Sequence, residues 1–249
     1  MQQTVLIVGG TSGLGRGLAE YYLHNGNKVA IVGRRQHLLD EIKQQFPQNS
    51  FTYQLDISDA NCQEQISKII TELGIDLLVL SASTIEFNPD LSFEKEAEMI
   101  RTNVLGYTAV LNSAYHYFKK KGSGHIVGIT SIAAARGNKT AIAYNASKAF
   151  QSSYLEGLRL KLQTESSQIH VTEIIPGYVA TTMAKGDRLF WVASLLKAVA
   201  QIVTAIEQKK KRVFVTKRWQ IIYNIYQFLP LSLYTFLINS KIKFKQKPN

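Results

Sequence analysis

Tyr144 and Lys148 are the residues most suited to chemistry, and they stand four positions apart in Tyr144-Asn145-Ala146-Ser147-Lys148, with Ser131 thirteen residues upstream. Residues four apart share one face of a helix. A neighbouring ammonium favours the phenolate and so lowers the pKa of a phenol, which is ordinarily near ~10. The spacing therefore predicts a tyrosine that can exchange a proton with a substrate. It also fits a plain helix with a surface tyrosine and a solvated lysine.

A second candidate site opens the chain. Residues 4–8 read as a buried strand and residues 16–23 as a helix, and Gly9-Gly10-Thr11-Ser12-Gly13-Leu14-Gly15 joins them. A strand, a glycine loop and a helix in this order can hold a dinucleotide pyrophosphate on backbone N–H groups and the helix N-terminus. Glycines allow the tight turn and the close approach to phosphate that a Cβ would block. An ordinary turn is the alternative for the loop taken alone.

These motifs, in this order, resemble the short-chain dehydrogenase/reductase family over residues 4–215. The landmarks are Gly9, Gly13, Gly15, Asp56, Asn103, Ser131, Tyr144, Lys148, Pro176, Gly177 and Thr181. The resemblance implies an α/β fold, namely a Rossmann-like, doubly wound, mostly parallel seven-stranded sheet with helices on both faces.

The resemblance also implies a mechanism for interconverting a carbonyl and an alcohol by hydride transfer. Ser131 would hydrogen-bond the substrate oxygen, and Tyr144 would protonate it. Lys148 would lower the phenol pKa and bind the nicotinamide ribose. The backbone carbonyl of Asn103 would anchor a water through which the proton is replaced. The Tyr–Lys spacing of four argues against the enoyl-reductase branch, whose spacing is seven.

Strand and helix patterns alternate along the chain, which predicts a parallel sheet covered on both faces. The predicted strands are residues 4–8, 28–32, 51–55, 76–80, 125–130, 169–175 and 213–215. The predicted helices are residues 16–23, 61–73, 91–121 with an interruption at Gly106, 142–164 and 191–208. Ser131 then follows the carboxyl end of a strand, where ligands of such sheets bind.

Gly33-Arg34-Arg35 follows the second strand, where NAD-preferring enzymes of this fold carry an acidic residue. A 2′-phosphate is doubly negative, so an arginine fork suits it and a carboxylate repels it. We therefore expect NADP(H) to be preferred, with NAD(H) possible, and Arg34 to make the main contact with Arg35 secondary. The alternative is that both arginines are solvated charges at a helix entry.

Further cofactor contacts follow from the resemblance. Asp56 would touch the adenine amino group, or could cap the next helix, a role that suits Ser58 or Asp59 better. The family's Asn-Asn-Ala-Gly reads here as Leu80-Ser81-Ala82-Ser83, a departure that bears on cofactor affinity. The predicted cofactor-binding residues are Gly9, Thr11, Ser12, Gly13, Leu14, Gly15, Arg34, Arg35, Asp56, Ser81, Ala82, Tyr144, Lys148, Pro176, Gly177, Val179 and Thr181.

The substrate pocket is less defined by the sequence. Ser131 and Tyr144 should contact the reacting group, and Met183, Phe190 and Trp191 could line the rest. These three side chains could equally pack their loop onto the body of the protein. The segment between Thr181 and the next helix is short, so we expect an open pocket for a hydrophobic carbonyl or alcohol.

The net charge of +11 is concentrated at the C-terminus: residues 208–249 hold ten Lys or Arg and no Asp or Glu. We expect residues 1–215 to form one dinucleotide-binding and catalytic domain, and residues 216–249 to form a basic, apolar helical extension. Two uncharged segments, 219–229 and 231–240, are divided by Pro230. They predict two amphipathic helices that pack on the body or a second subunit, or lie on an anionic membrane surface.

Composition favours a cytoplasmic enzyme, one that could lie peripheral to the inner face of a membrane. The chain opens without a basic, apolar leader, its single cysteine cannot form an internal disulfide, and its five histidines show no metal-ligand spacing. A homodimer or homotetramer is expected, and nucleic acid is not an expected partner. Two other readings stay open: a cofactor-binding regulatory protein with little turnover, and a nucleic-acid or membrane-binding protein that works through its basic tail.

Overall fold

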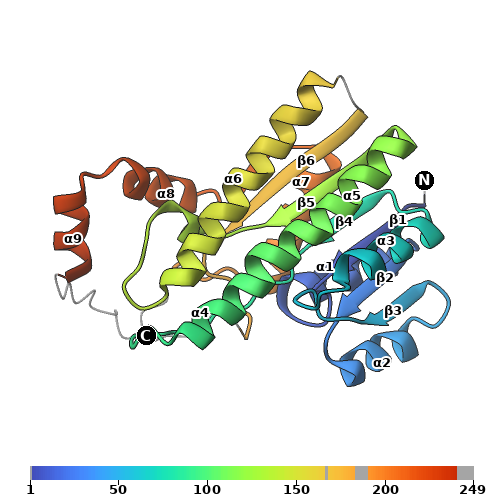
Figure 1. Cartoon of the computed structure of the whole chain (residues 1–249). Helices are drawn as coiled ribbons and strands as arrows, with labels where there is room; N and C mark the ends of the chain where they lie inside the picture. The colour runs from blue at the N-terminus through green and yellow to red at the C-terminus, as the bar shows by residue number, and fades with distance from the viewer. Residues whose placement is uncertain (1, 166–167, 183–189, 240–249) are drawn as a thin grey trace.

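A single sheet of seven parallel strands forms the centre of the protein in the computed structural model, which describes residues 2–165, 168–182 and 190–239 (Figure 1). The strands are β1 (Thr4–Val8), β2 (Lys28–Gly33), β3 (Ser50–Gln54), β4 (Leu77–Leu80), β5 (Ser123–Ile129), β6 (Gln168–Pro176) and β7 (Arg212–Val215). Their order is β3-β2-β1-β4-β5-β6-β7, and every pairing is parallel. The predicted fold class is confirmed.

Both faces of the sheet are buried, which explains why the strands read as continuous apolar runs. Along β1, Leu6 and Val8 face one core while Val5 and Ile7 face the other. The register pairs Leu6 with Ala30 of β2 and Leu78 of β4, so equivalent positions face the same side across the sheet.

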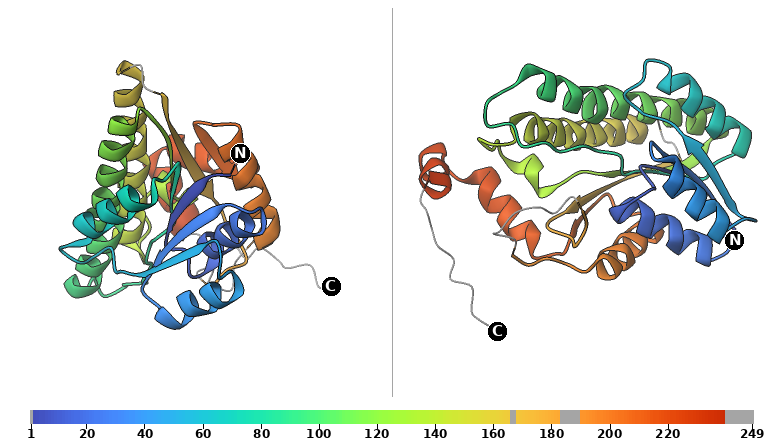
Figure 2. Two further views of the ribbon diagram at one scale, coloured as in Figure 1. Left: turned by 90° about the vertical axis from the view of Figure 1, so that its right-hand side faces the viewer. Right: turned by 90° about the horizontal axis from the view of Figure 1, so that it is seen from below.

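Helices cover both faces of the sheet, and Figure 2 shows these two layers. The helices α1 (Gly13–His24), α2 (Gln36–Gln45) and α7 (Leu195–Glu207) pack on one core, and α3 (Cys62–Leu73), α5 (Tyr107–Lys121) and α6 (Ile142–Thr164) on the other. Helix α2 was not predicted; it buries only Leu39 and Ile42 within a polar sequence. Ser58 or Asp59 was expected to cap α3, but Asn61 holds that position.

The long helix expected over residues 91–121 is in fact three segments. α4 (Phe93–Ile100) leads into a π-helical turn, η1 (Arg101–Gly106), and then into α5. Gly106 itself keeps ordinary helical angles, with φ −61°. Its role is close packing, because a Cβ there would overlap the Ile57 carbonyl. The interruption thus spans Arg101–Gly106, with the expected position, Gly106, at its C-terminal end and Asn103 near its middle.

Helix α7 begins at Leu195 rather than at the predicted residue 191. Trp191 has φ 54°, which a helix excludes, and Ala193 forms an isolated parallel bridge with Val179. Ser194 then caps the helix, because its Oγ accepts a hydrogen bond from the Lys197 N–H at 3.3 Å.

The C-terminal extension forms two helices, α8 (Trp219–Phe228) and α9 (Leu231–Asn239), on either side of Pro230. Trp219 and Tyr223 are buried against Ile175 and Phe214, so the inner face of α8 packs on the body. The two helices lie together at the end of the molecule away from the N-terminus (Figure 1). Across the described residues, every helix is too short or too polar to span a bilayer.

Candidate active site

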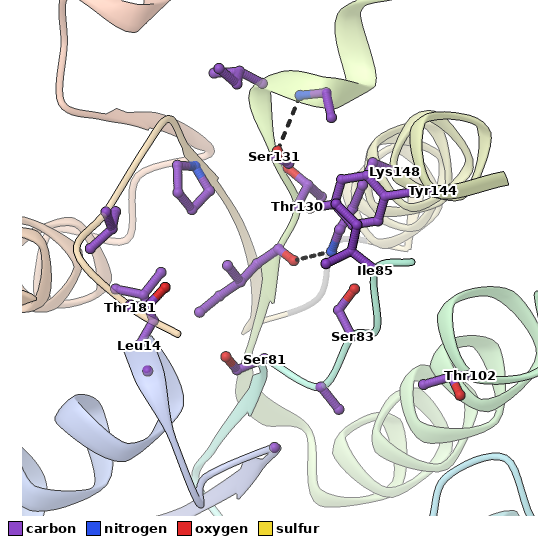
Figure 3. A pocket seen from close by; sticks show the side chains of 18 of the residues that line it. Leu14, Ser81, Ser83, Ile85, Thr102, Thr130, Ser131, Tyr144, Lys148 and Thr181 are labelled. Carbon is purple, nitrogen blue, oxygen red and sulfur yellow. Dashed lines mark hydrogen bonds between the residues drawn. The ribbon is translucent and has the colours of Figure 1, made fainter. Parts of the chain in front are cut away.

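A cavity of about 560 Å³ opens at the carboxyl ends of the strands, beside the point where strand order reverses between β1 and β4. It collects nearly all the residues singled out in the sequence, and Figure 3 shows Tyr144, Lys148, Ser131 and Thr181 around it. The predicted residues that line it are Gly9, Thr11, Ser12, Gly13, Leu14, Arg34, Arg35, Asp56, Ser81, Ala82, Ser131, Tyr144, Lys148, Pro176, Gly177, Val179 and Thr181. Among the described residues, Gly15 and Asn103 lie behind this lining.

The glycine loop has the shape that a dinucleotide's phosphates need. Gly9 and Gly13 have φ of 86° and 54°, a region that other residues rarely adopt. A Cβ on Gly9 would overlap the backbone of Ala82, and one on Gly15 would overlap the Gly9 carbonyl. Helix α1 starts at this loop, and within the described chain no side chain caps its first N–H groups. Those N–H groups remain available for an anion.

The two arginines after β2 occupy different places. Arg35 donates hydrogen bonds to the Thr11 hydroxyl at 3.0 Å and the Ser12 hydroxyl at 2.7 Å, so it lies against the glycine loop. Arg34 is 3.3 Å from a carboxylate oxygen of Asp56. Burial raises the pKa of Asp56, but hydrogen bonds from Ser58 and the Arg34 charge outweigh it and hold that pKa below its ordinary value. Asp56 thus closes a local turn with Ser58 and does not cap α3.

Tyr144 and Lys148 share one face of α6 as predicted, with Lys148 Nζ 5.7 Å from the centre of the Tyr144 ring. Burial raises the pKa of Tyr144, and a hydrogen bond with the Ser131 side chain partly offsets this. Burial lowers the pKa of Lys148 from 10.5 to about 7. The expectation that Lys148 simply depresses the phenol pKa was therefore incomplete, because desolvation acts on both side chains against their charged forms.

Ser131 lies two residues after the end of β5 and caps a short 3₁₀ turn, Ile132–Ala135. Its Oγ accepts a hydrogen bond from the Ala133 N–H at 3.1 Å, which fixes the side chain at the cavity wall. Asn145, next to the tyrosine, donates to the carbonyls of Ala133 at 3.0 Å and Arg136 at 2.7 Å. This amide holds the Ser131 segment against α6, a positioning role that the sequence analysis did not identify.

Asn103 is fully buried, and its side chain is used within the protein. Its Nδ2 donates to the Thr84 carbonyl and the Ser147 hydroxyl, at 2.8 and 3.1 Å, and its Oδ1 accepts from Thr84 and Ser83. The backbone carbonyl, expected to anchor a water, accepts a hydrogen bond from Gln151 Nε2 at 2.8 Å. The amide of Gln151 was not anticipated from the sequence.

The segment Leu80–Ser83, which departs from the family pattern, is held through its backbone. The N–H groups of Ser81 and Ala82 both donate to the Val8 carbonyl, at 2.8 and 2.9 Å. The Ser83 hydroxyl donates to Asn103 Oδ1 at 3.1 Å. Strands β1 and β4 are thus tied together beside the glycine loop without the family's asparagine side chains.

The substrate side of the cavity differs from the expectation. Neither Phe190 nor Trp191 belongs to its described lining; both rings pack on Trp219, with centroids 5.1 and 5.8 Å away. Met183 lies outside the described residues. The wall is formed mainly by apolar and tyrosine side chains: Ile85, Phe87, Ile132, Tyr178, Ile222, Tyr223, Tyr226 and Tyr234. Four of these come from α8 and α9.

Arg136 fastens the two C-terminal helices to the Ser131 segment. Its guanidinium donates to the Tyr226 carbonyl at 2.7 Å and also contacts the Leu229 carbonyl, so it satisfies the end of α8. The same group lies 5.2 Å from the centre of the Tyr234 ring, and the Tyr234 hydroxyl donates to the Gly137 carbonyl at 2.6 Å. The extension is therefore part of the cavity wall.

Comparisons with known proteins agree with this geometry. The sequence model described as short chain dehydrogenase matches residues 3–190. An uncharacterized oxidoreductase of Myxococcus xanthus is 34% identical over 188 residues, 73% of this chain and 74% of that protein. An NADP-dependent 3-hydroxy acid dehydrogenase of Escherichia coli is 31% identical over 183 residues, 72% of this chain and 73% of that protein. A short chain dehydrogenase of Burkholderia cenocepacia in complex with NADP shares the fold, with a TM-score of 0.81 at 23% identity and coverage of 96% and 99%.

Proposed function

Because the chain belongs to the short-chain dehydrogenase family, we propose that this oxidoreductase uses NADP(H) to interconvert a carbonyl and an alcohol on a hydrophobic substrate. One observation carries the proposal: Ser131, Tyr144 and Lys148 line the same cavity as the glycine loop, so a dinucleotide and a substrate can meet there. The regulatory alternative, with little turnover, is disfavoured because Ser131, Tyr144 and Lys148 all line this cavity and are chemically able to bind a substrate oxygen and transfer a proton.

The cofactor, when bound, supplies a hydride for the carbonyl carbon. Ser131 hydrogen-bonds the substrate oxygen, and Tyr144, whose raised pKa keeps it protonated at neutral pH, donates the proton to that oxygen. Lys148, with a pKa of about 7, is charged for part of the time at neutral pH and can return a proton to the tyrosinate. Positioned acid catalysis of this kind is worth roughly 10²–10⁴ in rate.

NADP(H) is the proposed cofactor because cations and hydroxyls gather where the 2′-phosphate would lie. Arg35, Thr11 and Ser12 form one hydrogen-bonded group, whereas Arg34 is paired with Asp56. We therefore give Arg35 the larger share of phosphate binding and Arg34 the smaller, the reverse of the order expected from the sequence. The E. coli relative, whose name includes NADP, supports the same cofactor.

The lining residues support a hydrophobic substrate. Ile85, Phe87 and Ile222 are aliphatic or aromatic, and Tyr226 and Tyr234 add rings with one polar tip each. Such a wall favours an apolar body and can orient it through hydroxyl groups. The E. coli relative is named for 3-hydroxy acids, and this chain offers Arg136 at the cavity, but its guanidinium is already committed to α8 carbonyls. An uncharged apolar substrate fits better.

The test is NADPH oxidation by the full-length protein over a panel of ketones and aldehydes of increasing apolar length. Tyr144→Phe keeps the ring and removes the proton, so turnover should fall by at least 10² while NADPH binding is nearly unchanged. Tyr154→Phe is the matched control, since Tyr154 lies on the same helix and packs on the core. Turnover by Tyr144→Phe at the level of that control would refute the mechanism.

We also propose that α8 and α9 rest on an anionic membrane surface. Their outward side exposes Ile221, Ile225, Phe228, Leu231, Leu233, Phe236 and Leu237. Exposed Lys217 and Arg218 precede α8, and Lys241, Lys243, Lys245 and Lys247 follow α9 in the sequence. An apolar helix face bordered by cations suits the headgroup region of acidic lipids, and each cation adds about 1 kcal/mol.

Sedimentation with liposomes tests this surface. The wild type should sediment with phosphatidylserine vesicles, be released by salt, and largely stay in solution with neutral vesicles. Phe228→Ser combined with Phe236→Ser should abolish sedimentation. Phe93→Ser combined with Leu196→Ser, at positions 75% and 84% exposed on α4 and α7, is the matched control. Equal behaviour of both variants would refute the proposal, and a change of elution volume in the first would indicate a homodimer or homotetramer face instead.

A further inference from the structure

The amide of Gln151 fills the space between the catalytic lysine and Asn103. Gln151 lies one helical turn beyond Lys148 on α6 and is fully buried. Its Oε1 accepts a hydrogen bond from Lys148 Nζ at 2.9 Å, and its Nε2 donates to the Asn103 carbonyl at 2.8 Å. Lys148 Nζ also donates to the Ile129 carbonyl at 3.3 Å. Gln151 thus bridges Lys148 and the Asn103 carbonyl, where a water was expected from the sequence.

The π-helical turn η1 makes this contact possible. A π-helical turn replaces i→i+4 bonding with i→i+5 bonding, and such turns recur at functional sites. The carbonyl of Asn103, within this turn, points to α6 and meets the Gln151 amide. The Asn103 side chain is meanwhile held by Thr84 and Ser147. The acceptor for Gln151 is therefore fixed on a rigid, fully bonded residue.

Burying a side-chain amide costs free energy unless its oxygen and its nitrogen are both hydrogen-bonded, and in Gln151 both are. An amide differs from a water in having one acceptor end and one donor end that cannot exchange roles. With Nε2 committed to a carbonyl, Oε1 must face Lys148 and always presents an acceptor to it. Such an arrangement favours the ammonium form of a lysine that burial otherwise disfavours.

We propose that Gln151 is a positioning residue of this active site, whose amide takes the place of a bridging water, holds the Lys148 ammonium, and links it to Asn103. The proposal rests on the oxidoreductase function proposed above. It predicts that the charge of Lys148 responds in opposite directions to two changes at position 151. Gln151→Leu removes the acceptor and should disfavour the ammonium, while Gln151→Glu adds a negative charge and should favour it.

Other charged groups near α6 do not account for such a response. Among the described residues, the buried titratable side chains on α6, α5 and β6 include Tyr144, Tyr107 and Glu173, and Glu173 is paired with Arg212 at 3.1 Å. Burial is the cause of the low Lys148 pKa. The acceptor that faces its Nζ from a side chain is Gln151.

The direct test needs no substrate. Full-length protein labelled with ¹³C at lysine Cε is titrated by NMR, and Lys148→Ala assigns the resonance. We expect the Lys148 midpoint to fall by about 1 pH unit in Gln151→Leu and to rise by about 1 in Gln151→Glu, the size of one charged hydrogen bond. Ser152→Ala, the neighbouring position on α6, is the control and should leave the midpoint in place.

Kinetics give a second readout. The neutral-pH limb of the kcat profile should move with the NMR midpoint in each variant, whereas damage to packing would lower kcat equally at all pH values. A Lys148 midpoint unchanged in both variants would overturn the proposal. Shifted midpoints without any carbonyl reduction by the wild type would uphold the contact and refute the proposed function instead. If Gln151→Leu does not fold, the isosteric Gln151→Glu decides the question.

Discussion

At the scale of single residues, the site is built from two buried groups that burial pushes toward their neutral forms. Tyr144 and Lys148 are 8% and 2% exposed, and burial disfavours the phenolate of one and the ammonium of the other. The pKa of Lys148, about 7, lets this amine gain or lose a proton near neutrality, which an ordinary lysine does not do, while Tyr144 stays protonated beside it. This arrangement carries a cost in folding stability.

Lys148→Met should reveal that cost through pH. The pKa of Lys148 in the folded protein, about 7, lies below its ordinary value of 10.5, so the unfolded chain binds more protons between these values. The amine therefore destabilises the fold fully below pH 7 and not at all above pH 10.5. We expect the Tm of the variant relative to wild type to be higher at pH 7 than at pH 10 by on the order of 10 °C, because the pKa difference corresponds to about 3–4 kcal/mol over this range and each kcal/mol to roughly 2–4 °C. A pH-independent difference would contradict the low pKa.

Cofactor choice is the second prediction at this scale. Arg35→Ala should weaken NADPH by about 1.5–3 kcal/mol, or about 10- to 100-fold, and leave NADH nearly unchanged. Arg34→Ala should have a smaller effect, because its charge is shared with Asp56 and its side chain is 58% exposed. Fluorescence titration with both cofactors measures this. Equal losses for NADPH and NADH would make Arg35 a structural support of Thr11 and Ser12.

The residues found from the sequence and those missed differ in one respect. Tyr144, Lys148 and the glycine loop carry their spacing within a few positions, so local pattern identifies them. Gln151, Asn145 and Arg136 act through partners such as Asn103 or the α8 carbonyls, which only the folded chain brings near. An interior Gln or Asn on a helix carries no local signal of that partner.

At the scale of elements, the strand boundaries were predicted within two residues, because the strands are short runs rich in apolar, β-branched and aromatic residues. The helices were predicted less well where backbone geometry, and not side-chain pattern, sets the boundary. Trp191 with positive φ shortens α7, and η1 divides a stretch whose sequence reads as one helix. α2 was missed because its sequence is mostly polar and it buries only Leu39 and Ile42.

The packing of Trp219 against Gly177 gives a prediction about how firmly α8 is held on the body. Gly177 leaves room for the Trp219 indole, and a Cβ there would overlap it. Gly177→Ala should therefore displace α8 and cost about 1–3 kcal/mol, the usual range for overpacking. Gly137→Ala, where a Cβ would meet nothing within 4 Å, is the matched control. Chemical denaturation distinguishes the two, and equal stabilities would show that α8 is loosely seated.

At the scale of the whole molecule, the parallel topology brings segments that are distant in the sequence together at the carboxyl ends of the strands. The loops after β1, β2, β4, β5 and β6 all reach the cavity, and the strand-order reversal between β1 and β4 leaves room for it. The sequence predicted a site at these strand ends. It did not predict that α8 and α9 would close the substrate side, because uncharged amphipathic segments fit several partners equally well.

His125, near the amino-terminal end of β5, predicts how the stability of the fold changes in acid. Burial, with His170 and Lys209 nearby, lowers the pKa of His125 from 6.5 to about 4. The unfolded chain thus binds more protons between pH 6.5 and 4, and stability is lost as pH falls through that window, on the order of 3 kcal/mol. His125→Gln can keep the hydrogen bond to Thr172, now 2.8 Å, without titrating. Its unfolding free energy should fall less steeply over this range, and a slope equal to wild type would contradict the assignment.

The cluster around Trp219 has a spectroscopic consequence. The chain has two tryptophans, and their rings lie 5.8 Å apart, with Tyr178 5.3 Å from Trp219. Both fluorescent side chains therefore lie in one cluster, next to Gly177 and Tyr178 of the cavity wall. Reduced nicotinamide absorbs where tryptophan emits, so bound NADPH should quench this fluorescence by energy transfer. The wild-type protein thus carries its own optical probe, which reports cofactor binding and the seating of α8 without any label.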